Sequence, residues 1–400
     1  MRRVLLRWMF ALAVTHSALA QGSSYCAAHS STLYCQLPSL YGNSEVNPLL
    51  PINEALGTQL TLVPLASPAS GIVFTMDPSL KIPVASGTET LGPVLTERGE
   101  TLYRRKLFVA STYQRFRFNS LDGVNFKSIP MVFEFCTSAG QCGPIAVVSR
   151  VDAHLEQFAL FGTYGITNWL DVSAAIPFAK VTLDAEGIGC TEPYCSFTTA
   201  GGVTVAFQQA SKSGSDTGLG DIVLRAKANP FKFEKFRLAI GSDFRLPTGD
   251  TLNFLGAGSP GVKPFVAVSR SGRFSPHVNL SYQWNGSSLL GGSTLGEKGA
   301  MPKNISYIGG IDAGLSKSFT LSADYLGEHV MDESRLAKVT TLGVADTAQA
   351  QGSFDAIRGA IGFKWLAWRQ FLITGNVLQK FDHNGLHHTT VPLAGVSYTF

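Results

Sequence analysis

The stretch HVNLSYQWN, residues 277–285, alternates polar and apolar side chains with a period of two. In an extended chain Val278, Leu280, Tyr282 and Trp284 share one face, and the polar residues between and beside them share the other. A helix would repeat its apolar residues every 3.6 positions instead, so the stretch predicts a β-strand. Its length fits the roughly 9–11 residues that a tilted strand needs to cross a bilayer.

Runs of the same kind recur from residue 105 to the C-terminus, joined alternately by short turns and by longer polar loops. Short turns at one end and long loops at the other are typical of outer-membrane barrels. The sequence therefore predicts an all-β fold, a transmembrane antiparallel up-and-down β-barrel of about 12 strands over residues 105–400. The expected strands are 105–119, 151–165, 168–182, 219–231, 235–248, 261–271, 273–285, 304–317, 318–331, 353–366, 369–382 and 390–400.

A soluble two-sheet sandwich is the alternative fold, because it also alternates apolar and polar residues. Soluble strands are shorter, about 5–6 residues, and the four tryptophans beyond the signal peptide all lie at strand ends, as in the girdles of membrane barrels. The chain also ends on an alternating aromatic strand that resembles the signal read by the bacterial barrel-assembly machinery. The candidate membrane-interface aromatics are Trp169, Trp284, Trp365, Trp368, Tyr398 and Phe400.

If the apolar faces contact lipid, the polar faces line the lumen. The lumen-facing candidates carry charges of both signs, which do not favour simple anion or cation selectivity. They form either an ionic network that holds the wall or a solute-selective constriction. The candidates are Arg115, Arg117, Asp171, Asp221, Arg225, Lys227, Arg237, Asp243, Arg245, Asp312, Asp324, Glu328, Arg358 and Lys364.

The first twenty residues resemble a secretory signal peptide, with a basic start, an apolar centre and the small residues Ala18 and Ala20 before the expected cleavage site. Removing them takes three arginines from a chain of net charge +4 and leaves a net charge of about +1, so no nucleic-acid partner is expected. Residues 21–104 are rich in Ser, Pro, Gly and Leu and lack sustained periodicity. We expect them to be irregular and to form either a plug in the lumen or a periplasmic linker.

All six cysteines follow the signal peptide and fall into three close pairs. In an exported chain this spacing predicts local disulfides. Zinc is the alternative, but no CxxC motif or suitably spaced histidine occurs, so neither a metal nor a cofactor is expected. The disulfide candidates are Cys26, Cys35, Cys136, Cys142, Cys190 and Cys195.

Two motifs resemble a known family. Thr217-Gly-Leu-Gly-Asp-Ile222 and Leu246-Pro-Thr-Gly-Asp250 look like the "TGLGD" and "LPTGD" signatures of the MetA-pathway of phenol degradation family, and Tyr164–Asp171 looks like its "YGLTD" turn. The resemblance extends over roughly residues 150–400. It implies an outer-membrane barrel that passes small, often hydrophobic or aromatic, compounds, and it assigns no catalytic residue. Local turn chemistry also explains Asp221 and Asp250 as caps of loop amides.

The sequence therefore predicts a channel in the bacterial outer membrane for passive diffusion of small solutes, including hydrophobic or aromatic compounds. Its expected partners are outer-membrane lipid, the barrel-assembly machinery and a solute that the sequence does not identify. A structural or adhesive barrel that binds a partner through its outer loops is the alternative. An outer-membrane hydrolase is a further one, but no Ser–His pair lies at a suitable spacing, so we do not expect an enzyme.

Overall fold

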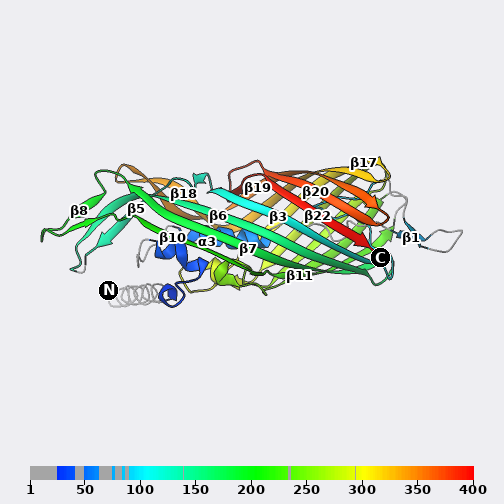
Figure 1. The fold of residues 1–400 in the computed structure, drawn as a ribbon, viewed down its shortest axis with the longest axis horizontal. Helices are drawn as coiled ribbons and strands as arrows, with labels where there is room; N and C mark the ends of the chain where they lie inside the picture. The colour runs from blue at the N-terminus through cyan, green and yellow to red at the C-terminus, as the bar shows by residue number, and fades with distance from the viewer. Residues whose placement is uncertain are drawn as a thin grey trace, which may run out of the picture.

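The computed structural model describes residues 25–40, 49–62, 74–76, 83–85, 90–137, 139–232, 236–292 and 294–400. The expected signal peptide, residues 1–20, lies outside the described residues. Figure 1 shows a long barrel of strands, with the C-terminus toward one end and the β5 and β8 hairpins at the other.

Twelve antiparallel strands form a closed barrel, which confirms the predicted fold. Each strand pairs with the next along the chain, and the ring closes where the last strand pairs with the first, Ala394 opposite Tyr113. Closure leaves no unpaired strand edge in the ring, as a hydrocarbon environment requires. The strands are β3 (Leu107–Leu121), β6 (Cys142–Gly165), β7 (Leu170–Cys190), β11 (Ile222–Lys232), β12 (Phe236–Leu246), β13 (Gly261–Arg270), β14 (Phe274–Asn285), β17 (Lys303–Ser316), β18 (Phe319–Thr341), β19 (Val344–Trp368), β20 (Phe371–Lys380) and β22 (Val391–Thr399).

Shorter elements extend the barrel or lie within it. Five of these strands lie in the connections that follow β3 and β7: β4 (Val124–Asn125), β5 (Ile129–Cys136), β8 (Ser196–Thr198), β9 (Thr204–Ala206) and β10 (Ala210–Leu219). The remaining ones are β1 (Phe74–Met76), β2 (Pro83–Ala85), β15 (Ser287–Ser288), β16 (Gly299–Ala300) and β21 (Leu386–His388). The helices are η1 (Leu33–Cys35), α2 (Gln36–Ser39), α3 (Leu50–Leu62), η2 (Thr251–Asn253) and η3 (Leu289–Gly291).

The outer surface of the barrel carries an apolar band. On β14 the exposed side chains are apolar, with Leu280 56% exposed, whereas the alternate residues, such as Ser281 and Gln283, are buried toward the lumen. Such a band flanked by aromatic residues is the lipid-facing surface of a transmembrane barrel. The protein therefore lies in a lipid bilayer. No helix among the described residues is long and apolar enough to span a membrane.

The expected interface aromatics occupy the two ends of this band. Trp169 lies in the turn between β6 and β7, Trp365 and Trp368 at the end of β19, and Tyr398 and Phe400 at the C-terminus, all near the short turns. Trp284 lies at the opposite end of β14. The four tryptophans and Phe400 are exposed, and Tyr398 is half-buried. Their contact with lipid headgroups stays a prediction.

On three neighbouring strands the apolar band ends along one line. Tyr113, Phe158 and Phe178 are directly opposite one another on β3, β6 and β7, and all three are exposed. Two residues farther toward the long loops, the same outward positions are Arg115, Glu156 and Lys180. The strands therefore continue beyond the bilayer, because β6 has 24 residues and β7 has 21, about twice what a membrane crossing needs.

Two lumen assignments are wrong for this reason. Arg115 and Arg117 face outward, with side chains 54% and 58% exposed, and they pair with Glu156 and Asp152 across the sheet. The inward positions beside them are the buried Phe116 and Phe118. Beyond the membrane the strand meets water outside and a packed core inside, so its polarity inverts while its alternation continues.

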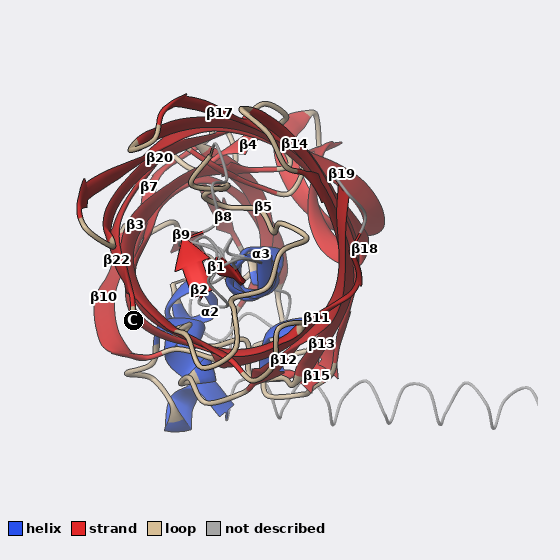
Figure 2. Ribbon diagram, turned by 90° about the vertical axis from the view of Figure 1, so that its right-hand side faces the viewer, coloured by secondary structure: helices blue, strands red, loops and turns tan. Residues whose placement is uncertain are grey.

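The N-terminal segment is less irregular than expected, because part of it is helical. Figure 2 shows α3 inside the ring of strands. Residues 51–59 are all buried, and Ile52 and Leu56 belong to the same core as Phe116 and Phe118. A helix surrounded on all sides needs no apolar stripe, which explains why its sequence lacks a helical period.

Candidate functional site in the barrel lumen

Residues 90–103 run through the lumen without joining the sheet, and side chains of the barrel wall satisfy their backbone groups. Asn279 accepts a hydrogen bond from the amide of Glu97 (2.7 Å) and donates one to its carbonyl (2.8 Å). The amide of Gly99 donates to the hydroxyl of Ser269 (2.9 Å). Buried backbone groups need such partners, so polar side chains on the inner wall hold the segment in one register.

Further contacts anchor both ends of this lumen segment. The amide of Leu91 donates to Thr320 Oγ1 (2.8 Å), and Lys364 donates to the carbonyl of Pro93. At the other end, the amide of Leu102 donates to Asp171 Oδ2 (2.6 Å). The predicted lumen residues Asp171 and Lys364 therefore bind the chain's own N-terminal segment.

Glu97 is the main charged contact between the lumen segment and the wall. Its carboxylate is 9% exposed, accepts a hydrogen bond from Arg225 and lies 3.2 Å from Lys227 Nζ. Arg225 also donates to both oxygens of Asp243 on the neighbouring strand, through Nε (2.5 Å) and Nη2 (2.7 Å). The wall thus provides two cations, and the segment provides a carboxylate that neutralises part of their charge.

His277 forms a second contact with the lumen segment. Its Nε2 lies 2.8 Å from Thr96 Oγ1 and 2.8 Å from Asp324 Oδ1, and its Nδ1 lies 3.5 Å from Asp312 Oδ2. The three wall residues come from β14, β17 and β18, and all four side chains are buried. The group therefore joins the lumen segment to three strands of the wall.

Four further predicted lumen residues, Arg237, Arg245, Glu328 and Arg358, lie on inward positions of their strands. Glu328 and Arg358 form a buried ion pair between β18 and β19. Arg245 donates to Asn285 Oδ1 (2.8 Å), and Arg237 lies near the short-turn end of β12. These contacts are wall-to-wall, as expected for an ionic network that supports the barrel.

The aspartates of the two motifs cap loop amides. Asp221 accepts hydrogen bonds from the amides of Gly249 (3.1 Å) and Ala257 (2.8 Å). Asp250 accepts one from the amide of Leu252 (3.0 Å) at the start of η2. The two aspartates therefore hold the loop between β12 and β13 in place through its backbone amides.

A cavity of about 130 Å³ lies between the lumen segment and the wall. Leu95 and Glu97 of the segment form one side, and β11, β12, β13, β14, β17 and β18 form the other. The wall residues that line it are Val223, Arg225, Asp243, Arg245, Gly261, Val262, Lys263, Phe265, Asn279, Ser281, Gln283, Ile308, Leu326 and Glu328.

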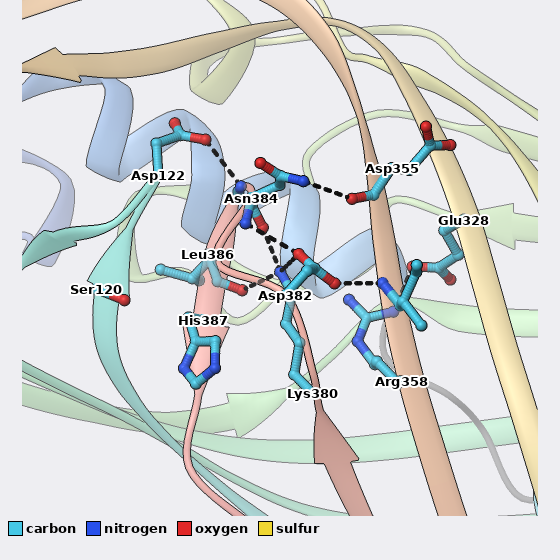
Figure 3. A network of polar contacts seen from close by, with 12 residues as sticks. Ser120, Asp122, Glu328, Asp355, Arg358, Lys380, Asp382, Asn384, Leu386 and His387 are labelled. Atoms are coloured by element: carbon cyan, nitrogen blue, oxygen red, sulfur yellow. Dashed lines mark hydrogen bonds and ion pairs between the residues drawn. The ribbon is translucent and has the colours of Figure 1, made fainter.

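Near the long-loop end, a polar network holds the loop before β22 against the wall (Figure 3). Lys380 lies between Asp382 and the carbonyl oxygens of Asn384 and Leu386. Asp122 accepts hydrogen bonds from the amide of Gly385 (2.8 Å) and from Arg335 (2.9 Å). The sequence offered only one hint of this network, the Asp-Gly turn at residues 122–123.

The three predicted disulfides are confirmed: Cys26–Cys35, Cys136–Cys142 and Cys190–Cys195. The first closes the region of η1, the second lies at the turn between β5 and β6, and the third joins the end of β7 to the residue that precedes β8. Within the described parts of the chain, no group of three or more His, Cys, Asp or Glu side chains has a geometry that would hold a metal ion.

Comparison with known proteins finds a family similarity over part of the chain. Residues 140–326 match the family described as "Putative MetA-pathway of phenol degradation". The family resemblance is confirmed. The matched residues run from the start of β6 into β18 and include the TGLGD and LPTGD motifs. None of the curated proteins compared with the sequence matches it.

Three solved structures are similar in shape. The COG4313 outer membrane channel from Pseudomonas putida F1 gives a TM-score of 0.45 at 10% identity, over 75% of this chain and 97% of that one. The NanC porin gives 0.39 at 8% identity, over 72% and 98%. The CymD monoaromatic hydrocarbon channel gives 0.37 at 7% identity, over 74% and 88%.

Proposed function

We propose that this protein is a bacterial outer-membrane channel for passive diffusion of small solutes, and that residues 21–104 act as its plug. One observation carries the proposal: residues 90–103 cross a polar lumen, are held there by wall side chains, and leave a cavity beside them. A barrel that served only as an anchor would have no use for a polar inner wall, because a packed apolar interior is more stable than buried charges.

A plug role fits the contacts better than a linker role. Glu97 is paired with two wall cations, and Thr96 contacts His277. A linker beneath the barrel would be solvated and would not need charged partners on the wall. Movement of the segment would expose these cations to the lumen and open a path along the wall.

We expect the solutes to be small. Aromatic compounds are among the candidates, because the family description names a phenol degradation pathway. Export would begin with cleavage after Ala20, and the barrel-assembly machinery would recognise the alternating C-terminal strand. We assign no catalytic role, because the buried lumen histidine His277 is engaged by Thr96, Asp312 and Asp324.

The test is single-channel conductance of the full chain and of a variant that lacks residues 21–100, each reconstituted in planar bilayers. The proposal expects a large rise in conductance on deletion. Heat-modifiable migration of both proteins on gels confirms that the barrel is folded. A folded deletion variant that stays closed would contradict the plug.

One observation favours a second function, an adhesive barrel. The hairpins β5–β6 and β8–β9 project beyond the membrane boundary; Cys136–Cys142 closes the turn of the first, and Cys190–Cys195 closes the chain at the base of the second. Stiffened hairpins are suited to binding a partner. A closed deletion variant together with loss of surface attachment after removal of both hairpins would favour this alternative.

A further inference from the structure

The lumen cavity beside Glu97 has one apolar side. Leu95 of the lumen segment and Val223, Phe265, Ile308 and Leu326 of the wall line it. Its volume of about 130 Å³ is close to the roughly 150 Å³ of an apolar cavity known to bind benzene. The space therefore fits a ligand whose apolar part is about one ring in size, and not a drug-sized molecule.

The carboxylates that border this cavity are already paired. Glu97 is bound by Arg225 and Lys227, and both oxygens of Asp243 accept hydrogen bonds from Arg225. Glu328 is bound by Arg358 on the neighbouring strand. Both oxygens of Glu97 and of Asp243 contact a cation, and Oε2 of Glu328 is paired with Arg358, so each carboxylate at the cavity already has a cation partner within the wall.

Lys263 differs from the other cations at the cavity. Its Cα is directly opposite that of Asp243, a register in which opposite charges usually attract. Because Arg225 occupies both oxygens of Asp243, no ion pair of Lys263 occurs among the described residues. Lys263 therefore lines the cavity without an ion-pair partner among the described residues.

Two further donors border the same space. The Nε of Arg245 is buried without a hydrogen-bond acceptor, and the nearest carboxylate oxygen, Asp221 Oδ2, is 3.6 Å from it. No hydrogen bond joins the hydroxyl of Ser281 to other described side chains. Arg245 is thus paired with Asp221 only at long range, and Lys263 has no ion-pair partner among the described residues. A partly buried cation without a close partner is costly, so an anionic group beside Lys263 is stabilised.

We propose that this cavity, here called the Lys263 cavity, binds a small monocarboxylate with an apolar part of about one ring. The carboxylate lies against Lys263 and Arg245, and the apolar part lies against Phe265 and Leu326. This inference rests on the proposed channel function, in which the cavity is a station on the solute path. Glu97, held by Arg225 and Lys227 on the same wall, shows that a carboxylate is bound there by this chemistry.

The test is isothermal titration of the detergent-solubilised full chain with benzoate, its neutral analogue benzyl alcohol, and acetate, which lacks the ring. We expect benzoate to bind one saturable site and the other two to bind at least tenfold more weakly. Lys263→Gln should weaken the binding of benzoate at least tenfold and leave the affinity for benzyl alcohol unchanged. The matched control Lys317→Gln changes an exposed lysine in the turn after β17 and should bind benzoate as the natural chain does.

Equal binding of benzoate and benzyl alcohol by the natural chain would overturn the inference without any variant, and so would unchanged benzoate binding by Lys263→Gln. Liposome swelling with a neutral sugar separates this outcome from failure of the channel. Swelling without benzoate binding would contradict the Lys263 cavity alone. If the full chain bound benzoate but neither it nor the variant without residues 21–100 gave swelling, the channel would be contradicted and the Lys263 cavity would be retained.

Discussion

The pairing of Glu97 with the wall gives the most specific prediction for gating. Glu97→Gln keeps the size of the side chain and one acceptor oxygen but removes the charge that Arg225 and Lys227 share. Breaking a buried ion pair by removal of one partner costs about 3–5 kcal/mol. Because the amide of Gln can still accept a hydrogen bond, we expect the lower value, about 3 kcal/mol.

A loss of about 3 kcal/mol shifts an equilibrium by roughly 100-fold, since about 1.4 kcal/mol corresponds to a factor of ten. The barrel itself should stay folded, because Arg225 keeps both hydrogen bonds to Asp243. We therefore expect the open probability of single channels to rise by up to about 100-fold. The backbone contacts of Asn279 and Ser269 remain, so the segment should still return to the lumen.

Asp243→Asn is the matched control for this measurement. It removes the other carboxylate bound to Arg225 but leaves the pairing of Glu97 with both cations. Its open probability should stay within about threefold of the natural chain. The reasoning is refuted if Glu97→Gln stays as closed as the natural chain while deletion of residues 21–100 opens the pore.

Three more predictions concern the lipid face and two buried titratable groups. Leu280→Arg, in the middle of the outward face of β14, should lower the free energy of unfolding in liposomes by about 2–4 kcal/mol, whereas Arg117→Leu, beyond the membrane boundary, should change it by less than about 0.5 kcal/mol. Burial raises the pKa of Glu54 on α3, so its contribution to the docking of α3 is present at low pH and is lost as pH rises through that pKa; Glu54→Gln should reduce this pH dependence, measured by hydrogen exchange of α3. Burial and, next, the charge of Arg358 lower the pKa of His388 to about 3. The contribution of neutral His388 to the free energy of unfolding is therefore present above about pH 6.5 and is lost by about 1.4 kcal/mol per pH unit as pH falls toward 3. In urea titrations, the free energy of unfolding of His388→Gln should fall less steeply between about pH 6 and 3 than that of the natural chain.

The barrel strands were predictable because lipid imposes a strict rule on them. On β14 every outward position meets acyl chains and every inward one meets polar groups, so the alternation is complete. The same rule failed at Arg115 and Arg117. Their alternation continues from Tyr113, but the solvent on each side of the sheet changes, and periodicity alone does not reveal which face meets water.

The plug contacts were not predictable in the same way. Glu97 meets Arg225 across 128 residues of sequence, and residues 90–103 have no regular pattern because wall side chains, not a neighbouring strand, satisfy their backbone. The position of Lys263 was not predictable from the sequence either. Its pattern is that of any inward lysine, and only the occupation of Asp243 by Arg225 leaves it without an ion-pair partner among the described residues.

The orientation of the two strand faces is the claim on which the channel, the plug and the cavity all depend. It is tested most directly by nitroxide accessibility at neighbouring positions of β14, introduced separately as Leu280→Cys and Ser281→Cys in a chain whose six native cysteines are joined in disulfides. In liposomes we expect the label at position 280 to collide with oxygen far more often than with a water-soluble nickel chelate, and the label at position 281 to be screened from lipid. If the two labels behaved alike, or if position 280 met the chelate more often than oxygen, the apolar face would not lie in acyl chains and the account would be wrong.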